Sequence, residues 1–241
     1  MTSRSGRFIV AIGLALQMAN LAPAAEPMSF GVLTAPPYGL EGPNDAVSGS
    51  NRDIGALIAA KVGLTFTYRL EPLARLVSDL KVGKLDLMIM FPTDETRPFA
   101  VAEIMPNSTV VLPKPGSSFQ QFADLKGKTI ASLRGAVYDK QFTADESIER
   151  YPVDSYLIGL RMTKGGRVDG MIGPDFGLYY QIAVAGMKRD EFGPPLVLNT
   201  RMLFLLASKA IPPELVARLK VATDELRASG AIDATANKYV N

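Results

Sequence analysis

Segments with strand and helix patterns alternate along the chain, and this alternation limits the possible folds more than any other feature. Apolar residues recur at every second position in 64–70, which is typical of a half-buried strand. The segment 72–83 has apolar residues at helical spacing, begins at a proline and ends at a glycine. Residues 85–91 then form an almost continuous apolar run, as expected for a strand that is covered on both faces. This order predicts an α/β fold with mainly parallel sheets flanked by helices.

A seven-residue motif occurs twice in the chain. Residues 83–89 and 166–172 both read glycine, a basic residue, an apolar residue, aspartate, any residue, methionine and isoleucine. In both copies a predicted helix ends and a predicted buried strand begins. Two copies fit two similar α/β lobes, whereas a solenoid needs more copies at a shorter period. Chance similarity is the alternative, because short motifs often match by accident.

Residues 1–24 have the pattern of a secretory signal peptide, which we expect to be cleaved. Two arginines precede an apolar run, and Ala22-Pro23-Ala24 supplies small residues at the usual cleavage spacing. A membrane anchor is the alternative, but polar residues interrupt the run, which is shorter than the roughly 20 apolar residues of a spanning helix. Cleavage removes two arginines and no acidic residue, which takes the formal charge from +2 to zero. We therefore expect the protein in the periplasm.

The sequence contains no cysteine and no histidine. This excludes disulfides, cysteine-ligated metals and any Ser/His/Asp or Cys/His catalytic arrangement. We expect no metal, no cofactor and no catalytic residue. The low net charge, without a basic cluster that is interleaved with aromatic residues, argues against nucleic-acid binding. The composition favours a binding protein over an enzyme, and we expect a monomer.

Loops that follow the predicted strands are the expected place for a ligand. In open parallel sheets, the ligand crevice lies beyond the carboxyl ends of the strands. Two such loops belong to each predicted lobe: residues 35–38, 91–97, 134–138 and 173–175. Together they offer an aromatic ring, an arginine, a helix N-terminus and a carboxylate. This set suits a small zwitterion or carboxylate.

Arg97 and Asp175 are the charged candidates in these loops. A guanidinium binds a carboxylate through two parallel hydrogen bonds, so Arg97 is the first candidate for an anionic group. The alternative is a solvated arginine that pairs with Asp94 or Glu95. Asp175 either accepts hydrogen bonds from a ligand ammonium or caps the helix that follows it.

The uncharged candidates are less specific. The backbone of Gly135 and Ala136 either donates N–H groups to an anion at a helix start or only forms a turn. Tyr38 and Phe91 either sandwich the ligand body or belong to the core, where isolated aromatic residues beside strands are more common.

These residues together resemble the extracellular solute-binding proteins of polar amino-acid ABC transporters, family 3, which have the type II periplasmic-binding-protein fold. The resemblance extends from about Phe30 to Tyr239. It rests on the following segments in this order: Pro37-Tyr38, Asn51-Arg52-Asp53-Ile54, Gly83-Lys84-Leu85-Asp86, Thr93-Asp94-Glu95-Thr96-Arg97, Asp124-Leu125-Lys126-Gly127-Lys128, Arg134-Gly135 and Gly166-Arg167-Val168-Asp169.

The resemblance implies a protein of two lobes with the ligand cleft at the hinge. Lobe 1 would contain residues 28–109 and 201–241, and lobe 2 would contain residues 110–200. The chain would cross between the lobes near 109–112 and 196–200. The expected partners are a small-molecule ligand and the membrane permease of an ABC transporter.

The resemblance also implies roles for individual residues. Arg97 matches the arginine that clamps the ligand carboxylate, and Tyr38 matches an aromatic residue of the pocket. Thr93 lies in a segment whose hydroxyls usually face the ligand, and Asp175 lies near the acid that holds the α-amine.

The chain departs from the family pattern at three places. Met90-Phe91-Pro92 stands where hydroxyl side chains are usual, Ala136-Val137 follows the glycine in place of threonine or serine, and Pro174 displaces the acid. These departures favour a less polar or differently shaped ligand. Two other functions stay open: a periplasmic lyase or dehydratase on the same fold, and a sensory module that does not serve transport.

Overall fold

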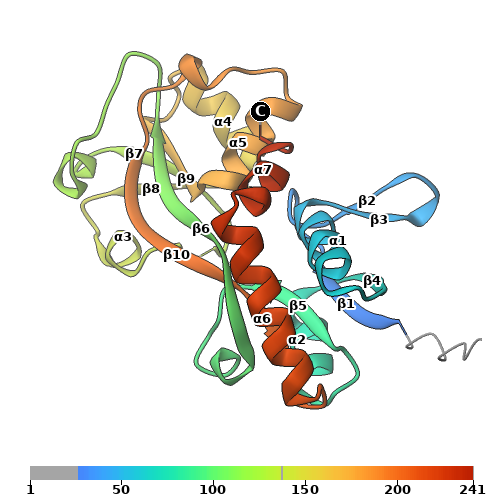
Figure 1. Ribbon diagram of the computed structural model, residues 1–241. Helices are drawn as coiled ribbons and strands as arrows, with labels where there is room; N and C mark the ends of the chain where they lie inside the picture. Colours follow the sequence, from blue (N-terminus) through green and yellow to red (C-terminus); the bar gives the residue numbers. More distant parts are fainter. Residues whose placement is uncertain (1–26, 137, 241) are drawn as a thin grey trace, which may run out of the picture.

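A computed structural model describes residues 27–136 and 138–240 (Figure 1). The predicted signal peptide lies outside these residues. The main element is one eight-stranded sheet with the order β4-β1-β5-β10-β6-β9-β7-β8. Its strands are β1 (Met28–Leu33), β4 (Phe66–Glu71), β5 (Leu87–Met90), β6 (Ala100–Pro113), β7 (Thr129–Leu133), β8 (Glu149–Val153), β9 (Gly170–Pro174) and β10 (Leu196–Ala207). A separate hairpin joins β2 (Leu40–Glu41) to β3 (Val47–Ser48).

Helices flank this sheet, which confirms the α/β prediction. They are α1 (Ser50–Val62), α2 (Leu73–Lys81), α3 (Lys140–Ala144), α4 (Tyr156–Lys164), α5 (Asp175–Val184), α6 (Pro213–Ala228) and α7 (Ala231–Asn237). Short 3-10 helices occur at η1 (Pro43–Asp45), η2 (Arg97–Phe99), η3 (Phe122–Leu125) and η4 (Arg189–Glu191). Within the residues described here, no helix has the length and apolar character needed to cross a membrane.

Two groups of parallel strands are joined by the two longest strands. β4, β1 and β5 are parallel to one another, as are β9, β7 and β8. β6 and β10 pair antiparallel between the two groups. One end of β10 pairs with β5, and the far end of β6 pairs with β9 (Figure 1). The chain therefore passes between the groups through β6 and β10.

The buried apolar residues form separate clusters for the two strand groups. Two clusters contain only residues from 28–105 and 203–232. Two others contain only residues from 110–198. A fifth cluster combines Tyr38 and Val240 with Phe176 of α5, and Figure 1 shows the C-terminal end of the chain close to α5. This separation gives the molecule two lobes, each with its own core.

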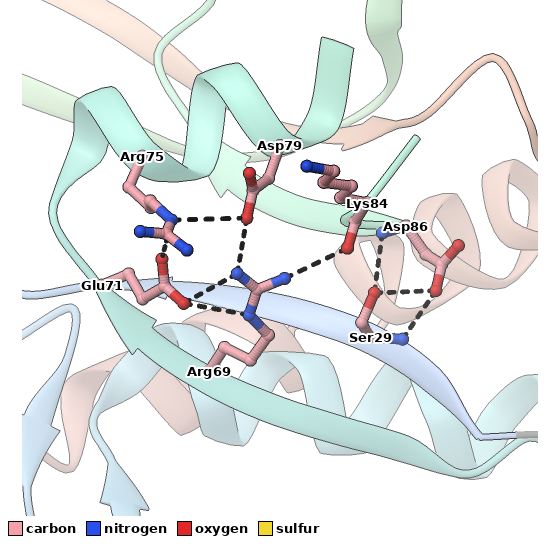
Figure 2. A network of polar contacts seen from close by, with 7 residues as sticks. All are labelled: Ser29, Arg69, Glu71, Arg75, Asp79, Lys84 and Asp86. Atoms are coloured by element: carbon pink, nitrogen blue, oxygen red, sulfur yellow. Dashed lines mark hydrogen bonds and ion pairs between the residues drawn. The ribbon is translucent and has the colours of Figure 1, made fainter. Parts of the chain in front are cut away.

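The repeated motif has the same structural role in both lobes. Asp86 accepts hydrogen bonds from the backbone N–H of Ser29 at 2.7 Å and from its hydroxyl at 2.8 Å (Figure 2). Asp169 accepts a hydrogen bond from the backbone N–H of Thr129 at 3.0 Å. Ser29 and Thr129 lie at the starts of β1 and β7, the parallel neighbours of β5 and β9. Each aspartate thus ties the starts of two parallel strands together, which favours a true repeat over chance similarity.

A network of charged side chains holds α2 against the edge strand β4 (Figure 2). Arg69 of β4 pairs with Glu71 at 2.7 Å and with Asp79 of α2 at 2.5 Å. It also donates a hydrogen bond to the carbonyl of Lys84 at 3.1 Å, which lies in the first copy of the motif. The hydrogen bond from Arg69 is the main cause that lowers the pKa of Asp79.

We expect this network to lose its stabilising effect in acid. Because the pKa of Asp79 is lower in the folded than in the unfolded protein, its contribution is complete above about pH 4 and is lost as the pH falls further. The Asp79→Asn variant should therefore lose less stability than the wild type between pH 7 and pH 3, as measured by urea denaturation. Asp94→Asn, in an exposed loop, is the matched control. Equal acid sensitivity of wild type and Asp79→Asn would contradict the assignment.

Candidate functional site

The loop after β1 positions Tyr38. The backbone N–H groups of Ser50 and Asn51, at the start of α1, donate to the carbonyls of Pro37 at 2.9 Å and Tyr38 at 3.0 Å. The side-chain amide of Asn107 in β6 donates to the Tyr38 hydroxyl at 2.6 Å. Burial is the main cause that raises the pKa of Tyr38, so its hydroxyl is neutral at physiological pH. Tyr38 is therefore fixed by both its backbone and its hydroxyl.

A cavity of about 200 Å³ lies beside Tyr38, at the carboxyl ends of β1 and β5. This is the place where open parallel sheets bind ligands. Three of the predicted ligand-binding residues, Tyr38, Phe91 and Thr93, line it together. Its complete wall is Leu33, Tyr38, Asn51, Leu73, Ile89, Met90, Phe91, Thr93, Arg201 and Leu203.

Two polar residues of this wall were not singled out as ligand-binding candidates. The buried amide of Asn51 donates to the carbonyl of Ile89 at 3.2 Å, which fixes α1 against the end of β5. The guanidinium of Arg201 lies 4.8 Å from the centre of the Phe91 ring. In the sequence, Asn51 occurs in a segment that carries the family resemblance, whereas the only signal for Arg201 is its place beside the predicted hinge.

Asp175 lies at the start of α5 in the other lobe. Its Oδ1 atom accepts the backbone N–H of Phe176 at 2.7 Å and that of Ser108 in β6 at 3.2 Å. Burial is the main cause that raises the pKa of Asp175, while these two hydrogen bonds act in the opposite direction. The carboxylate thus satisfies an N–H of the first helical turn, but Asp175 is itself the first residue of α5 and Pro174 occupies the cap position, so this is not the capping geometry that the alternative expects. In the described part of the chain no hydrogen bond to its Oδ2 atom is found.

The two lobes meet through aromatic side chains. The rings of Tyr38 and Phe176 have their centres 5.5 Å apart and are tilted by 54°. Arg189 of η4 lies over the ring of Tyr179 at 3.9 Å and donates to the carbonyl of Val240 at 2.8 Å. Tyr38 is the residue shared by the cavity wall and this contact between lobes.

Arg97 lies apart from this cavity. It is the first residue of η2, its side chain is exposed, and it is absent from the cavity wall. Among the residues that the structure describes, its side chain has no hydrogen bond or ion pair, and Glu95 pairs with Lys81 instead. The carboxylate-clamp role of Arg97 therefore stays a prediction.

Gly135 and Ala136 also lie apart, in the wall of a separate hollow of lobe 2. The helix that we expected directly after them begins only at Lys140, because Asp139 caps it by accepting the N–H of Phe142 at 2.9 Å. The N–H of Ala136 donates to the carbonyl of Leu133 at 3.1 Å. This geometry is that of the turn alternative, since no helix starts at Gly135.

Comparisons with known proteins agree on one family. A family model described as bacterial extracellular solute-binding proteins, family 3, matches residues 28–241. The probable amino-acid-binding protein YxeM of Bacillus subtilis is 26% identical over 210 residues, which are 82% of this chain and 78% of that protein. The L-arginine-binding protein of Pseudomonas aeruginosa is 26% identical over 232 residues, which are 90% of this chain and 88% of that protein.

Solved structures show the same fold. The second substrate-binding domain of a putative amino acid ABC transporter from Streptococcus pneumoniae has a TM-score of 0.71 and 16% identity, over 90% of this chain and 100% of that chain. An ancestral arginine-binding protein bound to arginine has a TM-score of 0.62 and 19% identity, also over 90% and 100%. With a family model that matches nearly every described residue and neighbours of the same two-lobed architecture, this chain belongs to the bacterial extracellular solute-binding proteins, family 3.

Proposed function

We propose that the protein is the periplasmic substrate-binding component of an ABC transporter. It binds a small ligand, an amino acid or a related carboxylate, between its lobes and delivers it to a membrane permease. The observation that carries this proposal is the double position of Tyr38, which lines the cavity of one lobe and contacts Phe176 of the other. A ligand in the cavity therefore contacts a residue whose packing on Phe176 depends on the relative position of the lobes.

Closure follows from differential binding. A ligand that touches both lobes binds the closed arrangement more tightly than the open one, so it shifts the population towards closure. We assign residues 28–109 and 201–241 to lobe 1 and residues 110–200 to lobe 2. The separate apolar clusters support this division, and β6 and β10 are the segments through which the chain crosses.

The proposed ligand contacts come from both lobes. Tyr38, Phe91 and Thr93 contact the ligand body in lobe 1, and Asp175 is available to an amine from lobe 2. Arg97 reaches the ligand carboxylate only if the exposed turn that carries it moves towards the cavity. The hollow beside Gly135 and Ala136 has a different set of lining residues. It is a second candidate for the ligand site.

A ligand screen tests the proposal. Purified protein is heated with each of the common amino acids and with small carboxylates, and each stabilising compound is then titrated by calorimetry. A compound at 100 times its Kd should add about 2.7 kcal/mol to the free energy of unfolding. The arginine-binding relative from Pseudomonas aeruginosa, screened with L-arginine, serves as the positive control. If that control responds and no compound binds this protein, the transport function is contradicted.

A further inference from the structure

We propose that the cavity beside Tyr38 selects a monocarboxylate with an apolar body, and that Arg201 recognises its charge. This inference rests on the proposed function and deepens it, because it names the ligand class and a specificity-determining residue. It differs from what the names of the relatives suggest, since two of them are arginine-binding proteins.

The cavity wall is almost entirely apolar. Its hydrophobic and aromatic members are Leu33, Tyr38, Leu73, Ile89, Met90, Phe91 and Leu203. Among the residues that the structure describes, no aspartate or glutamate lines it. A ligand with a cationic side chain would gain no counter-charge from this wall, because Asp175, the carboxylate proposed for an amine, is not part of it, and such a transfer from water is costly. An aliphatic or aromatic ligand body gains free energy from the same transfer.

In the described structure, each polar side chain of the wall other than Arg201 already has a hydrogen-bond partner. The Asn51 amide donates to the carbonyl of Ile89. The hydroxyl of Thr93 lies 3.1 Å from that of Thr96, within hydrogen-bond distance. Arg201 contacts the face of Phe91, and a contact of that kind leaves the in-plane N–H donors of a guanidinium available.

Strand register explains why Arg201 reaches this cavity. Arg201 of β10 pairs directly with Asn107 of β6. Directly opposed residues of antiparallel strands place their side chains on the same face of the sheet. On that face, the side-chain amide of Asn107 donates a hydrogen bond to the Tyr38 hydroxyl. The same register therefore brings the guanidinium of Arg201 to the wall that Tyr38 and Phe91 form.

The charge of the wall sets the charge of the ligand. Arg201 is the one ionised side chain among the lining residues, and in the described part of the protein it has no ion-pair partner. A single guanidinium matches a single carboxylate in charge and in planar shape. A monocarboxylate whose body fills the apolar end of the cavity satisfies both features. Among the described residues of this wall, none is a carboxylate that would pair with the α-amine of an amino acid.

Titration calorimetry with defined probes tests the inference. The probes are 4-methylpentanoate, the uncharged 4-methylpentanamide and L-arginine. We expect the carboxylate to bind at least about tenfold more tightly than its amide and more tightly than L-arginine. The Arg201→Met variant should lose at least about tenfold in affinity for the carboxylate, with its affinity for the amide unchanged within about twofold. The Arg201→Lys variant keeps the charge but loses the planar group. Its affinity for the carboxylate should therefore lie between those of the wild type and Arg201→Met.

Arg167→Met is the control, because this exposed arginine lies in the second copy of the motif and away from the cavity. Circular dichroism shows whether each variant is folded. Binding of L-arginine without binding of 4-methylpentanoate would overturn the ligand class and leave the transport function intact. Loss of carboxylate binding in Arg97→Met, with normal binding in Arg201→Met, would overturn the role of Arg201. Binding of no probe and of no compound in the wider screen would overturn both proposals.

Discussion

Replacement of Tyr38 by alanine should abolish detectable ligand binding and lower the free energy of unfolding by about 3 kcal/mol. The ring contributes to the cavity wall and packs on Phe176 of the other lobe. The alanine variant loses both contacts, and it also leaves the amide of Asn107, which is 4% exposed, without its acceptor. An unsatisfied buried donor costs about 1–3 kcal/mol.

The Tyr38→Phe variant separates these effects. It keeps the ring in the wall and against Phe176 but removes the hydroxyl that accepts from Asn107. We expect it to lose about 1–2 kcal/mol of stability and to retain ligand binding. Tyr151→Ala is the control, since this side chain lies on the edge strand β8, is 44% exposed and should change stability by less than about 0.5 kcal/mol. Chemical denaturation and calorimetry measure both properties. Ligand binding by Tyr38→Ala within threefold of the wild type would contradict the central position of this ring.

Replacement of Gly39 by alanine should lower the free energy of unfolding by about 3 kcal/mol, near the upper end for an overpacked site. A Cβ atom at this buried position would collide with the backbone carbonyl of Leu33 and approach the side chains of Val32 at 2.6 Å and Leu70 at 2.8 Å. A backbone carbonyl in a strand cannot move aside as a flexible side chain can. The strand end and the loop that carries Tyr38 must therefore shift, and we also expect weaker ligand binding.

Gly63→Ala is the matched control for this prediction. Gly63 ends α1 with φ of 71°, and no atom of the described residues lies within 4 Å of the position that a Cβ would take there. Alanine there meets only the strain of the left-handed conformation, about 1 kcal/mol. Urea denaturation of both variants gives the comparison. Equal destabilisation by the two substitutions would show that close packing at Gly39 is not the dominant effect.

Local patterns were sufficient to predict much of the fold. The alternating segment 64–70 corresponds to β4, and the apolar run 85–91 contains β5. The repeated motif correctly indicated two similar lobes, because each copy carries an aspartate that must satisfy the start of a neighbouring strand. Alternation and helix ends are visible within one segment of the sequence. The motif is visible because it recurs, although the strand starts that its two aspartates hold lie 57 and 40 residues away in the chain.

The arrangement of the candidate site depended on contacts that no local pattern contains. Arg201 reaches Phe91 because β10 pairs with β5 on one side and with β6 on the other, which joins segments far apart in the chain. The sequence predicts that Arg97 belongs to the loop after β5, but in the structure it begins η2, and the hydrogen-bonded hydroxyls of Thr93 and Thr96 fold the loop before it into a turn that leaves the arginine exposed. A loop can be located from its flanking strands, whereas the direction of its side chains depends on its internal hydrogen bonds.

The distance between the lobes with and without ligand tests the central claim most directly. The chain contains no cysteine, so spin labels on Asp94→Cys in lobe 1 and Lys140→Cys in lobe 2 report on these two positions alone. Pulsed electron spin resonance gives the distribution of distances between the labels. With a saturating concentration of the tightest-binding compound, we expect the distribution to become narrower and its mean to become shorter. An unchanged distribution at saturation would contradict a protein that closes its lobes over its ligand.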